Sequence, residues 1–419
     1  MRNLLWIVVI MLMSVQGYAS TILIPMDNKQ TNHLKAYGMA YWVLQNEVEV
    51  DWMLNYRGGS FAFKYYQKFE NELVIRGVSY EVISDAQYNQ IVSVIASPSS
   101  NMDLMKLEQY PKIAVYSPKT AQPWDDAVTL ALTYAEIPYD VVYDDEVLYN
   151  KLPEYDWLHL HHEDFTGQYG KFYRAFRNMR WYQERQMEME ELARKHGYEK
   201  VSQLKLVVAQ KIRDFVLGGG FMFAMCSATD TYDIALAAEG VDICEAMYDG
   251  DPADPNAQKK LDFSKTFAFI NFTLERNPWE YEFSNIDVNI AERGLSETND
   301  FFTLFEFSAK WDPVPTMLTQ NHERIVKGFM GQTTAFRKDF IRPDVVILGE
   351  NKAAQEAKYM HGEFGKGFWT FYGGHDPEDY RHNVGEAETD LNLYPNSAGY
   401  RLILNNILFP AAKKKKQKT

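Results

Sequence analysis

The sequence has little cysteine, little basic charge and no long apolar run in its interior. Its 419 residues include only two cysteines, Cys226 and Cys244. A disulfide framework is therefore excluded as the basis of the fold, and a chain of this length buries a large core without one. The two thiols can still pair with each other in an oxidising compartment, and this alternative stays open at the level of sequence.

Basic residues are outnumbered, with 43 lysines and arginines against 57 aspartates and glutamates, for a net charge of −14. An acidic surface repels phosphate backbones and anionic lipid, so we expect no binding to nucleic acid. The one basic run, Lys413 to Lys416, stands at the end of the sequence. We expect residues 411–419 to form a solvated, disordered tail.

The longest apolar run stands near the start of the sequence. Residues 4–15 are apolar apart from Ser14, and they are preceded by Arg2 and followed by the small residues Gly17 and Ala19. The run is shorter than the roughly 20 residues that span a bilayer, and its flanks are those of a cleavable signal peptide ending at Ala19. We therefore expect an exported protein, periplasmic or secreted, with no stable membrane insertion after cleavage of residues 1–19.

The remaining chain divides into two predicted regions, an N-terminal α/β region over residues 20–105 and a larger domain over residues 106–410. In the larger domain, short apolar strands alternate with amphipathic helices. This alternation is typical of an α/β fold with a doubly wound, mainly parallel sheet. Two insertions interrupt it: residues 171–200 are predicted to be helical, as a lid or a solvated decoration, and residues 249–316 to carry extra strands near 267–274.

Ligands of parallel sheets bind at the carboxyl ends of the strands, so the residues that follow the predicted strands are the candidates for a functional site. The predicted strands of the larger domain are 112–117, 139–143, 155–161, 221–225, 344–348 and 367–372, and its predicted helices are 124–136, 201–217, 229–240 and 397–409.

The strongest chemical signal is at Cys226. A glycine turn, Gly218 to Gly220, leads into the apolar strand 221–225, which ends at this cysteine just before a predicted helix. Such a strand-to-helix turn is the nucleophile elbow, which exposes a side chain at the top of a sheet. The helix N-terminus favours the thiolate. The alternative is a structural cysteine that packs as a small apolar residue.

Together with a second motif, residues 365–378, this elbow resembles the class I glutamine amidotransferase-like superfamily. In that superfamily a late strand ends in a catalytic histidine, followed by a proline and an acid, and His375, Pro377 and Glu378 match this pattern. Residues 399–408 are similar to the helix that follows in trehalose-utilisation-type (ThuA-like) members. The resemblance implies a flavodoxin-like sheet.

The resemblance also implies catalytic roles. Cys226 would be the nucleophile, and His375 would be its general base and then the acid toward the leaving amine. Glu378 would orient the imidazole, with Asp376 as the alternative.

An oxyanion hole is implied as well. One donor would be the backbone N–H of Ser227, directly after the nucleophile, and the second would come from the loop near Gly167. The sequence departs from the classical amidotransferases at Ala224 and Ala228, where glycine usually stands.

A cluster of histidines and acids follows the strand that ends at His161. Strand alternation puts His159 and His161 on one face and His162 on the other. Since this is a carboxyl end, the cluster should approach the elbow. We assign substrate binding to His161, His162 and Glu163. A metal site with histidine and carboxylate ligands, or histidines with a structural role only, are the alternatives. We assign no metal ligand and no cofactor.

The whole chain also resembles exported proteins commonly labelled asparagine synthetase B. A synthetase of that type needs a cysteine at position 2 and a Ser-Gly-Gly pyrophosphate loop, whereas position 2 is Arg2 and the loop is absent. We therefore expect a Cys–His hydrolase, amidase-like, acting on a small-molecule or peptide-like substrate. A non-catalytic binding protein on the same fold and a metal-dependent hydrolase are the alternatives. Residues 317–334 are distinctive, and the sequence gives them no mechanism.

Overall fold

The structure is a computed structural model that describes residues 19–118, 126–288, 293–312 and 323–412. The predicted signal peptide up to residue 18 and the basic tail from residue 413 lie outside the described residues. Contacts divide the chain into two compact units. Unit 1 comprises Met1–Tyr110, Phe307–His322 and Ala411–Thr419, and unit 2 comprises Pro111–Glu306 and Glu323–Pro410. The predicted insertion 249–316 is therefore shared between both units.

Unit 1 contains a five-stranded antiparallel sheet in the order β4-β1-β3-β2-β5. Helix α4 was not predicted, although Ser84 and Gln87 form a capping box that marks its start. The strands are β1 (Ala19–Ile24), β2 (Val50–Leu54), β3 (Ser60–Lys64), β4 (Glu81–Ser84) and β5 (Asp103–Leu107), and the helices are α2 (His33–Gln45), α3 (Gln67–Arg76) and α4 (Asp85–Ala96).

The side-chain amide of Asn101 holds the later segment of unit 1, which begins at Phe307. Asn101 donates from Nδ2 to the carbonyl of Phe307 at 2.9 Å and accepts the N–H of Ala309 on Oδ1 at 2.8 Å. Lys310 then donates to the carbonyls of Ile95 and Ser97 at 3.1 and 2.8 Å. These bonds satisfy the backbone of a segment that has no strand of its own.

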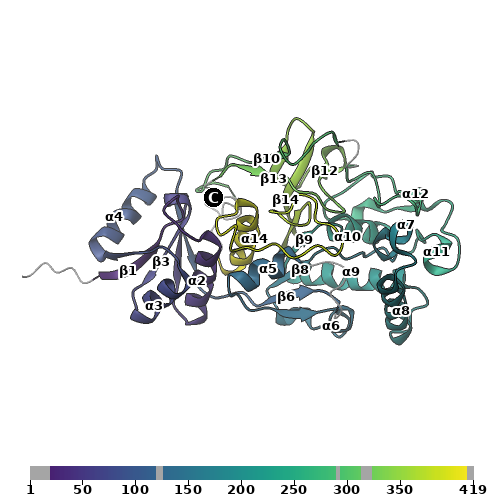
Figure 1. The fold of residues 1–419 in the computed structure, drawn as a ribbon, viewed down its shortest axis with the longest axis horizontal. Helices are drawn as coiled ribbons and strands as arrows, with labels where there is room; N and C mark the ends of the chain where they lie inside the picture. Colours follow the sequence, from purple (N-terminus) through teal and green to yellow (C-terminus); the bar gives the residue numbers. More distant parts are fainter. Residues whose placement is uncertain (1–18, 119–125, 289–292, 313–322, 413–419) are drawn as a thin grey trace, which may run out of the picture. The chain divides into compact units, whose positions relative to one another are not determined.

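Unit 2 contains a mixed sheet in the order β11-β10-β13-β14-β15-β9-β8-β6-β7, with β12 paired to β14 (Figure 1). The pairs among β7, β6, β8, β9 and β15 are parallel, and all others are antiparallel. The strands are β6 (Ile113–Tyr116), β7 (Asp140–Val142), β8 (Trp157–Leu160), β9 (Phe221–Met225), β10 (Phe301–Leu304), β11 (Ile325–Lys327), β12 (Phe336–Arg337), β13 (Val346–Asn351), β14 (Glu356–Phe364) and β15 (Gly367–Tyr372).

The antiparallel half differs from the mainly parallel sheet that the sequence indicated. The predicted strand 344–348 corresponds to β13, but β14 was not predicted and lies between β13 and β15. Residues 352–355 connect β13 to β14, and so short a connection permits only an antiparallel hairpin.

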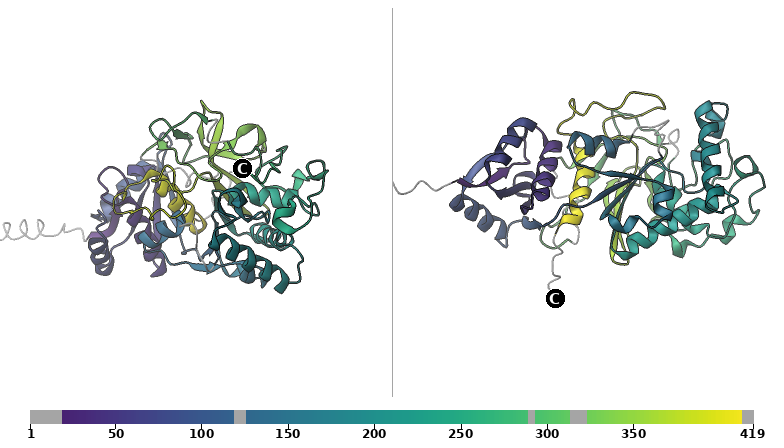
Figure 2. Two further views of the ribbon diagram at one scale, coloured as in Figure 1. Left: turned by 45° about the vertical axis from the view of Figure 1, so that its right-hand side comes forward. Right: turned by 90° about the horizontal axis from the view of Figure 1, so that it is seen from below.

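Helices cover both faces of the parallel half. Helix α9 (Val201–Gly218) and helix α10 (Ala228–Ala237) pack on one face against side chains such as Leu158, Met222 and Phe371. On the other face of the sheet, α14 (Ala398–Leu408) packs against α5 (Ala127–Tyr134; Figure 2), and Asn406 of α14 donates to Tyr359 of the neighbouring antiparallel strand β14 at 2.7 Å. None of the helices in the described ranges combines the length and apolar character needed to cross a membrane.

The two insertions fold differently from each other. Residues 171–200 are helical, as predicted, with α7 (Tyr173–Phe176) and α8 (Arg180–Lys195) packed on a separate core that they share with Leu204 of α9 and with Tyr248. The strands predicted near 267–274 are wrong, because this segment forms only isolated bridges. The carboxylate of Asp233 accepts the N–H groups of residues 267–269 at 2.7–2.9 Å and so removes them from any ladder.

Candidate functional site

Cys226 stands in a strained turn between β9 and α10. Its φ is 53°, in the left-handed region, which costs a residue with a Cβ roughly 1–2 kcal/mol. Its carbonyl accepts the N–H and the hydroxyl of Thr229 at 3.2 and 2.6 Å, which closes the turn. A strained non-glycine residue at a strand end is typical of a functional site.

The thiol of Cys226 is only 2% exposed, and both cysteines are free. The Sγ of Cys244 lies instead 3.3 Å from the carbonyl of Thr166, so the disulfide alternative does not occur in the structure. Gln332 donates its backbone N–H to Cys226 Sγ at 3.2 Å. The N–H dipole of Gln332 therefore points at the sulfur.

The loop of residues 329–335 joins Cys226 to His375. The register pairs Met225 of β9 with Tyr372 of β15, so both strands end at one edge of the sheet. Met330 accepts the backbone N–H of His375 at 2.9 Å, two residues before Gln332 reaches the thiol. Cys226 and His375, the pair expected from the sequence, therefore both form hydrogen bonds with the same short loop.

Five of the nine histidines in the sequence gather beside this edge. The ring of His375 stacks on His161 at 4.5 Å and on His382 at 4.9 Å between centroids. His162 lies 4.9 Å from His161 and 5.8 Å from His375. His159 is 5.5 Å from His161. The histidines after β8 thus approach His375, as expected for the ends of neighbouring strands.

Asp126 supplies the negative charge of this cluster. Its carboxylate lies 3.1 Å from His159 Nε2 and 3.2 Å from His161 Nδ1. Burial alone would raise the pKa of Asp126, but the charges and hydrogen bonds of the two histidines outweigh burial and hold it well below its usual range. The carboxylate also caps α5 by accepting the N–H groups of Val128 and Thr129 at 2.7 and 3.1 Å. Sequence reasoning missed this residue.

His162 is held in its neutral form. Burial, together with repulsion from His161 and His375, keeps its pKa well below the ordinary value of a histidine. At neutral pH it therefore offers a nitrogen lone pair rather than a positive charge.

Glu163, assigned to substrate binding, lies in a buried ion network. Its carboxylate is 3.2 Å from Arg185 and 4.0 Å from Lys205, and it accepts from the hydroxyl of Tyr143 at 3.4 Å. Two cations thus balance the carboxylate before any substrate arrives. Because Arg185 belongs to α8, this pair attaches the helical insertion to the end of β8.

The acids after His375 have partners that shape the turn. Asp376 accepts the backbone N–H of Glu378 and the hydroxyl of Thr389, both at 2.8 Å. The carboxylate of Glu378 contacts Ser397, and burial raises its pKa despite this hydrogen bond. Both acids therefore fold the chain after the histidine toward α14.

The two residues assigned to the oxyanion hole, Ser227 and Gly167, have different surroundings: Ser227 directly follows Cys226, whereas Gly167 packs against α9. Ser227 is fully buried directly after Cys226, and the next N–H, from Ala228, donates to the carbonyl of His161 at 2.9 Å. Gly167 has φ +84°, and a Cβ there would lie 2.7 Å from the backbone nitrogen of Ser202. Packing against α9 therefore accounts for this glycine.

Two buried charged residues fix the 329–335 loop. Lys358 donates from Nζ to the carbonyls of Phe329 and Thr334, and Asp287 accepts the N–H groups of Thr334 and Ala335 at 3.0 and 3.1 Å. Burial, helped by the charge of Arg293, lowers the pKa of Lys358 to about 7. These contacts give the end of the distinctive 317–334 segment a structural role, which the sequence did not predict. Residues 317–322 lie outside the described ranges.

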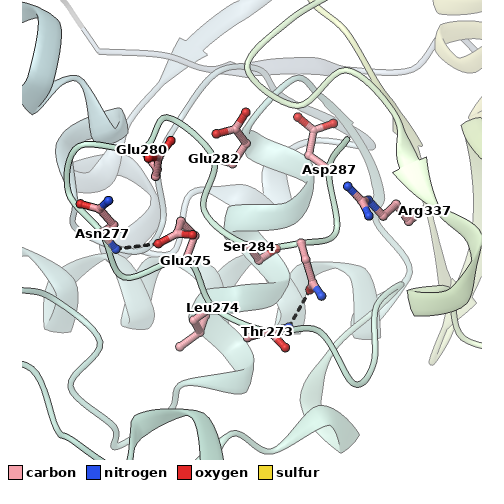
Figure 3. Close-up of a pocket in the computed structure, with 10 residues that line it drawn as sticks. Thr273, Leu274, Glu275, Asn277, Glu280, Glu282, Ser284, Asp287 and Arg337 are labelled. Atoms are coloured by element: carbon pink, nitrogen blue, oxygen red, sulfur yellow. Dashed lines mark hydrogen bonds between the residues drawn. The ribbon is translucent and has the colours of Figure 1, made fainter. Parts of the chain in front are cut away.

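A polar hollow of about 470 Å³ adjoins the loop. Its wall carries Glu280, Glu282 and Asp287 in a row, with Arg337 beside Asp287 (Figure 3). Gln332 contacts the segment that forms this wall, because its side chain donates to the carbonyl of Tyr281, between Glu280 and Glu282, at 3.3 Å while its backbone N–H donates to Cys226 Sγ.

No protein-family model and no curated protein matches the sequence. Among solved structures, the chain is similar to the cytoplasmic protein STM3548 from Salmonella typhimurium, with 9% identity and a TM-score of 0.34 over 72% of this chain and 100% of that one. Cytoplasmic protein STM1381 from the same species gives 12% identity and 0.32 over 72% and 100%. The GH42 β-galactosidase Gan42B gives 11% and 0.28 over 64% of this chain and 28% of the enzyme. Similarities this weak carry no argument.

Proposed function

We propose that this protein is an amidase-like hydrolase in which Cys226 is the nucleophile and His375 is the general base. The observation that carries the proposal is the left-handed backbone of Cys226 at the end of β9, with its sulfur accepting the N–H of Gln332 at 3.2 Å. Other described non-glycine residues also have positive φ, so it is the combination of this backbone with an N–H donor to the sulfur that supports a reactive cysteine.

The fold relationship that goes with this function is the class I glutamine amidotransferase-like superfamily, with its flavodoxin-like, doubly wound sheet. Numbering β6, β7, β8, β9 and β15 from 1 to 5 in chain order, their spatial order is 2-1-3-4-5. This order is typical of flavodoxin-like sheets, in which ligands bind beyond the carboxyl ends of the strands. Cys226 and His375 follow two of these ends.

In the proposed reaction the thiolate of Cys226 attacks an amide carbonyl, after His375 has taken the thiol proton. The C–N bond then breaks, and the imidazolium gives its proton to the leaving amine. Water attacks the thioester, which releases the carboxylic acid and restores the thiol. The backbone N–H groups of Ser227 and Gln332 are our candidates to stabilise the oxyanion.

Export supports hydrolysis rather than amide transfer to a second substrate. The apolar run of residues 4–15 supports export, and the exported compartment lacks the ATP that a glutamine-driven ligase needs. We propose small-molecule or peptide-like amides as substrates, no contact with nucleic acid, and a periplasmic or secreted location.

Thiol chemistry tests the proposal. Cys226→Ala should lower turnover of the best substrate from a panel of amides and esters by at least about three orders of magnitude. Cys244→Ala is the matched control, because the thiol of Cys244 is directed at the carbonyl of Thr166 and has no role in the proposed reaction. Iodoacetamide should inactivate the Cys244→Ala variant in step with labelling of Cys226. Full activity of Cys226→Ala would overturn the proposal.

A further inference from the structure

His161, His162 and His375 each bring a ring nitrogen to one point in unit 2. The three ligand atoms lie within 4.8 Å of one another. They come from the ends of β8 and β15, two elements separated by about half of the chain. We propose that these three histidines bind one divalent transition-metal ion, with Zn²⁺ as the first candidate. We further propose that the bound ion prevents His375 from acting as the general base for Cys226.

The orientation of His161 is the independent observation behind this site. Its Nδ1 lies 3.2 Å from Asp126 Oδ1, an ion-pair contact that favours a ring hydrogen on Nδ1 and the lone pair on Nε2. That Nε2 is buried and has no hydrogen-bond partner among the described residues. A carboxylate that orients a histidine in this way is the usual outer partner of a metal ligand.

The chemistry of the three groups selects the ion. Neutral imidazole nitrogens suit Zn²⁺, Cu²⁺ and Ni²⁺, whereas Mg²⁺ and Ca²⁺ require oxygen ligands. With Zn–N bonds of about 2.0–2.1 Å, tetrahedral ligand nitrogens stand roughly 3.3 Å apart, so the stacked rings of His161 and His375 must reorient to bring the nitrogens together around an ion. Three protein ligands leave a fourth position for water or an anion.

The regulatory part of the inference rests on the proposed function. A nitrogen that holds a metal ion has no lone pair for the thiol proton. With zinc bound, His375 cannot act as the general base for Cys226, and hydrolysis stops. The protein would then be active when zinc is scarce and inactive when zinc is abundant.

Direct binding tests the site without reference to activity. Co²⁺ is titrated by absorption spectroscopy and Zn²⁺ by calorimetry into the mature chain carrying Cys226→Ser, so that the thiol cannot act as a ligand. One ion per chain is expected. His161→Ala and His162→Ala should each weaken binding beyond the roughly 100-fold that outer-shell changes reach. His196→Ala is the matched control, because His196 pairs with Asp145 outside the cluster.

Every outcome of these titrations bears on the proposal. Absence of stoichiometric binding, or equal binding by the His161→Ala and His196→Ala variants, would overturn the metal site. Zinc that binds but activates the wild-type hydrolase would overturn the inhibitory role. Zinc binding with no thiol-dependent hydrolysis in any form would leave the metal site standing and remove the proposed function instead, so the two failures are distinguishable.

Discussion

The backbone at Cys226 favours an amino acid that cannot perform the proposed chemistry. Glycine adopts a φ of 53° freely, whereas a residue with a Cβ does not. The side chain is therefore kept against a local energetic preference, as expected of a group that acts on a substrate.

This strain gives a prediction at the residue scale. Cys226→Gly should be more stable than Cys226→Ala by about 1 kcal/mol, because both variants lack the thiol and only the alanine keeps the strained Cβ. Urea denaturation of the two variants measures the difference. If the alanine variant is equally stable, the turn is not strained and the argument for function from backbone geometry fails.

Residue types that carry chemistry were recognisable in the sequence, but their partners were not. Cys226, His161 and His375 come from motifs that end at strands, and the structure brings those strand ends to one edge. Gln332 acts through a backbone N–H, which no side-chain pattern reveals. Asp126 lies inside the predicted helix 124–136, and its contact with the histidines depends on long-range packing that the sequence does not reveal.

At the scale of elements, the 329–335 loop is the part on which the site depends. Gly331 is packed so closely against the turn at His375 that a Cβ would lie 2.8 Å from the backbone nitrogen of His375. The loop must therefore move if any side chain is added there, and Gln332 moves with it.

We predict that Gly331→Ala lowers kcat by about ten- to a hundred-fold through displacement of the Gln332 N–H and His375, since misplacement of catalytic groups by an ångström is costly. Gly218→Ala, at the end of α9, is the control, because a Cβ there meets nothing within 4 Å. Steady-state kinetics of both variants measure kcat and test this prediction. Equal losses in the two would show that the loop does not position the site.

The parallel elements were predictable because each is local: an apolar strand, a turn, an amphipathic helix. The antiparallel half was not. Strand β14 carries Glu356, Lys358 and His361 among buried positions, so it lacks a clean apolar pattern. These polar side chains are satisfied by distant groups, such as Arg293 for Glu356.

At the scale of the whole molecule, Lys358 links stability to pH. Its pKa is about 7 in the folded protein against an ordinary value of 10.5. Between these values the unfolded chain holds a proton that the folded chain has released, so stability rises with pH from about 7 to about 10.5 and is flat below that range as far as this residue is concerned.

We predict that Lys358→Met removes this rise, which amounts to at most about 1.4 kcal/mol per pH unit. The exposed Lys366 provides the control variant Lys366→Met, which should keep the wild-type slope. Denaturant unfolding between pH 6 and pH 10 measures the slopes, within roughly the window set by the two pKa values. Parallel curves for all three proteins would contradict the assignment.

The order in which the chain is made has a consequence for when activity can begin. All five strands of the sheet in unit 1 lie within the first 107 residues, so this sheet can form early during synthesis or export. The strand pair that aligns the thiol with its histidine joins β9 to β15, and β15 ends at Tyr372. A nascent chain that stops short of β14 and β15 can already carry this five-stranded sheet but lacks the strand pair that places Cys226 beside the strand leading to His375. If the proposed function holds, hydrolysis can begin only after β15 has been made and has paired with β9.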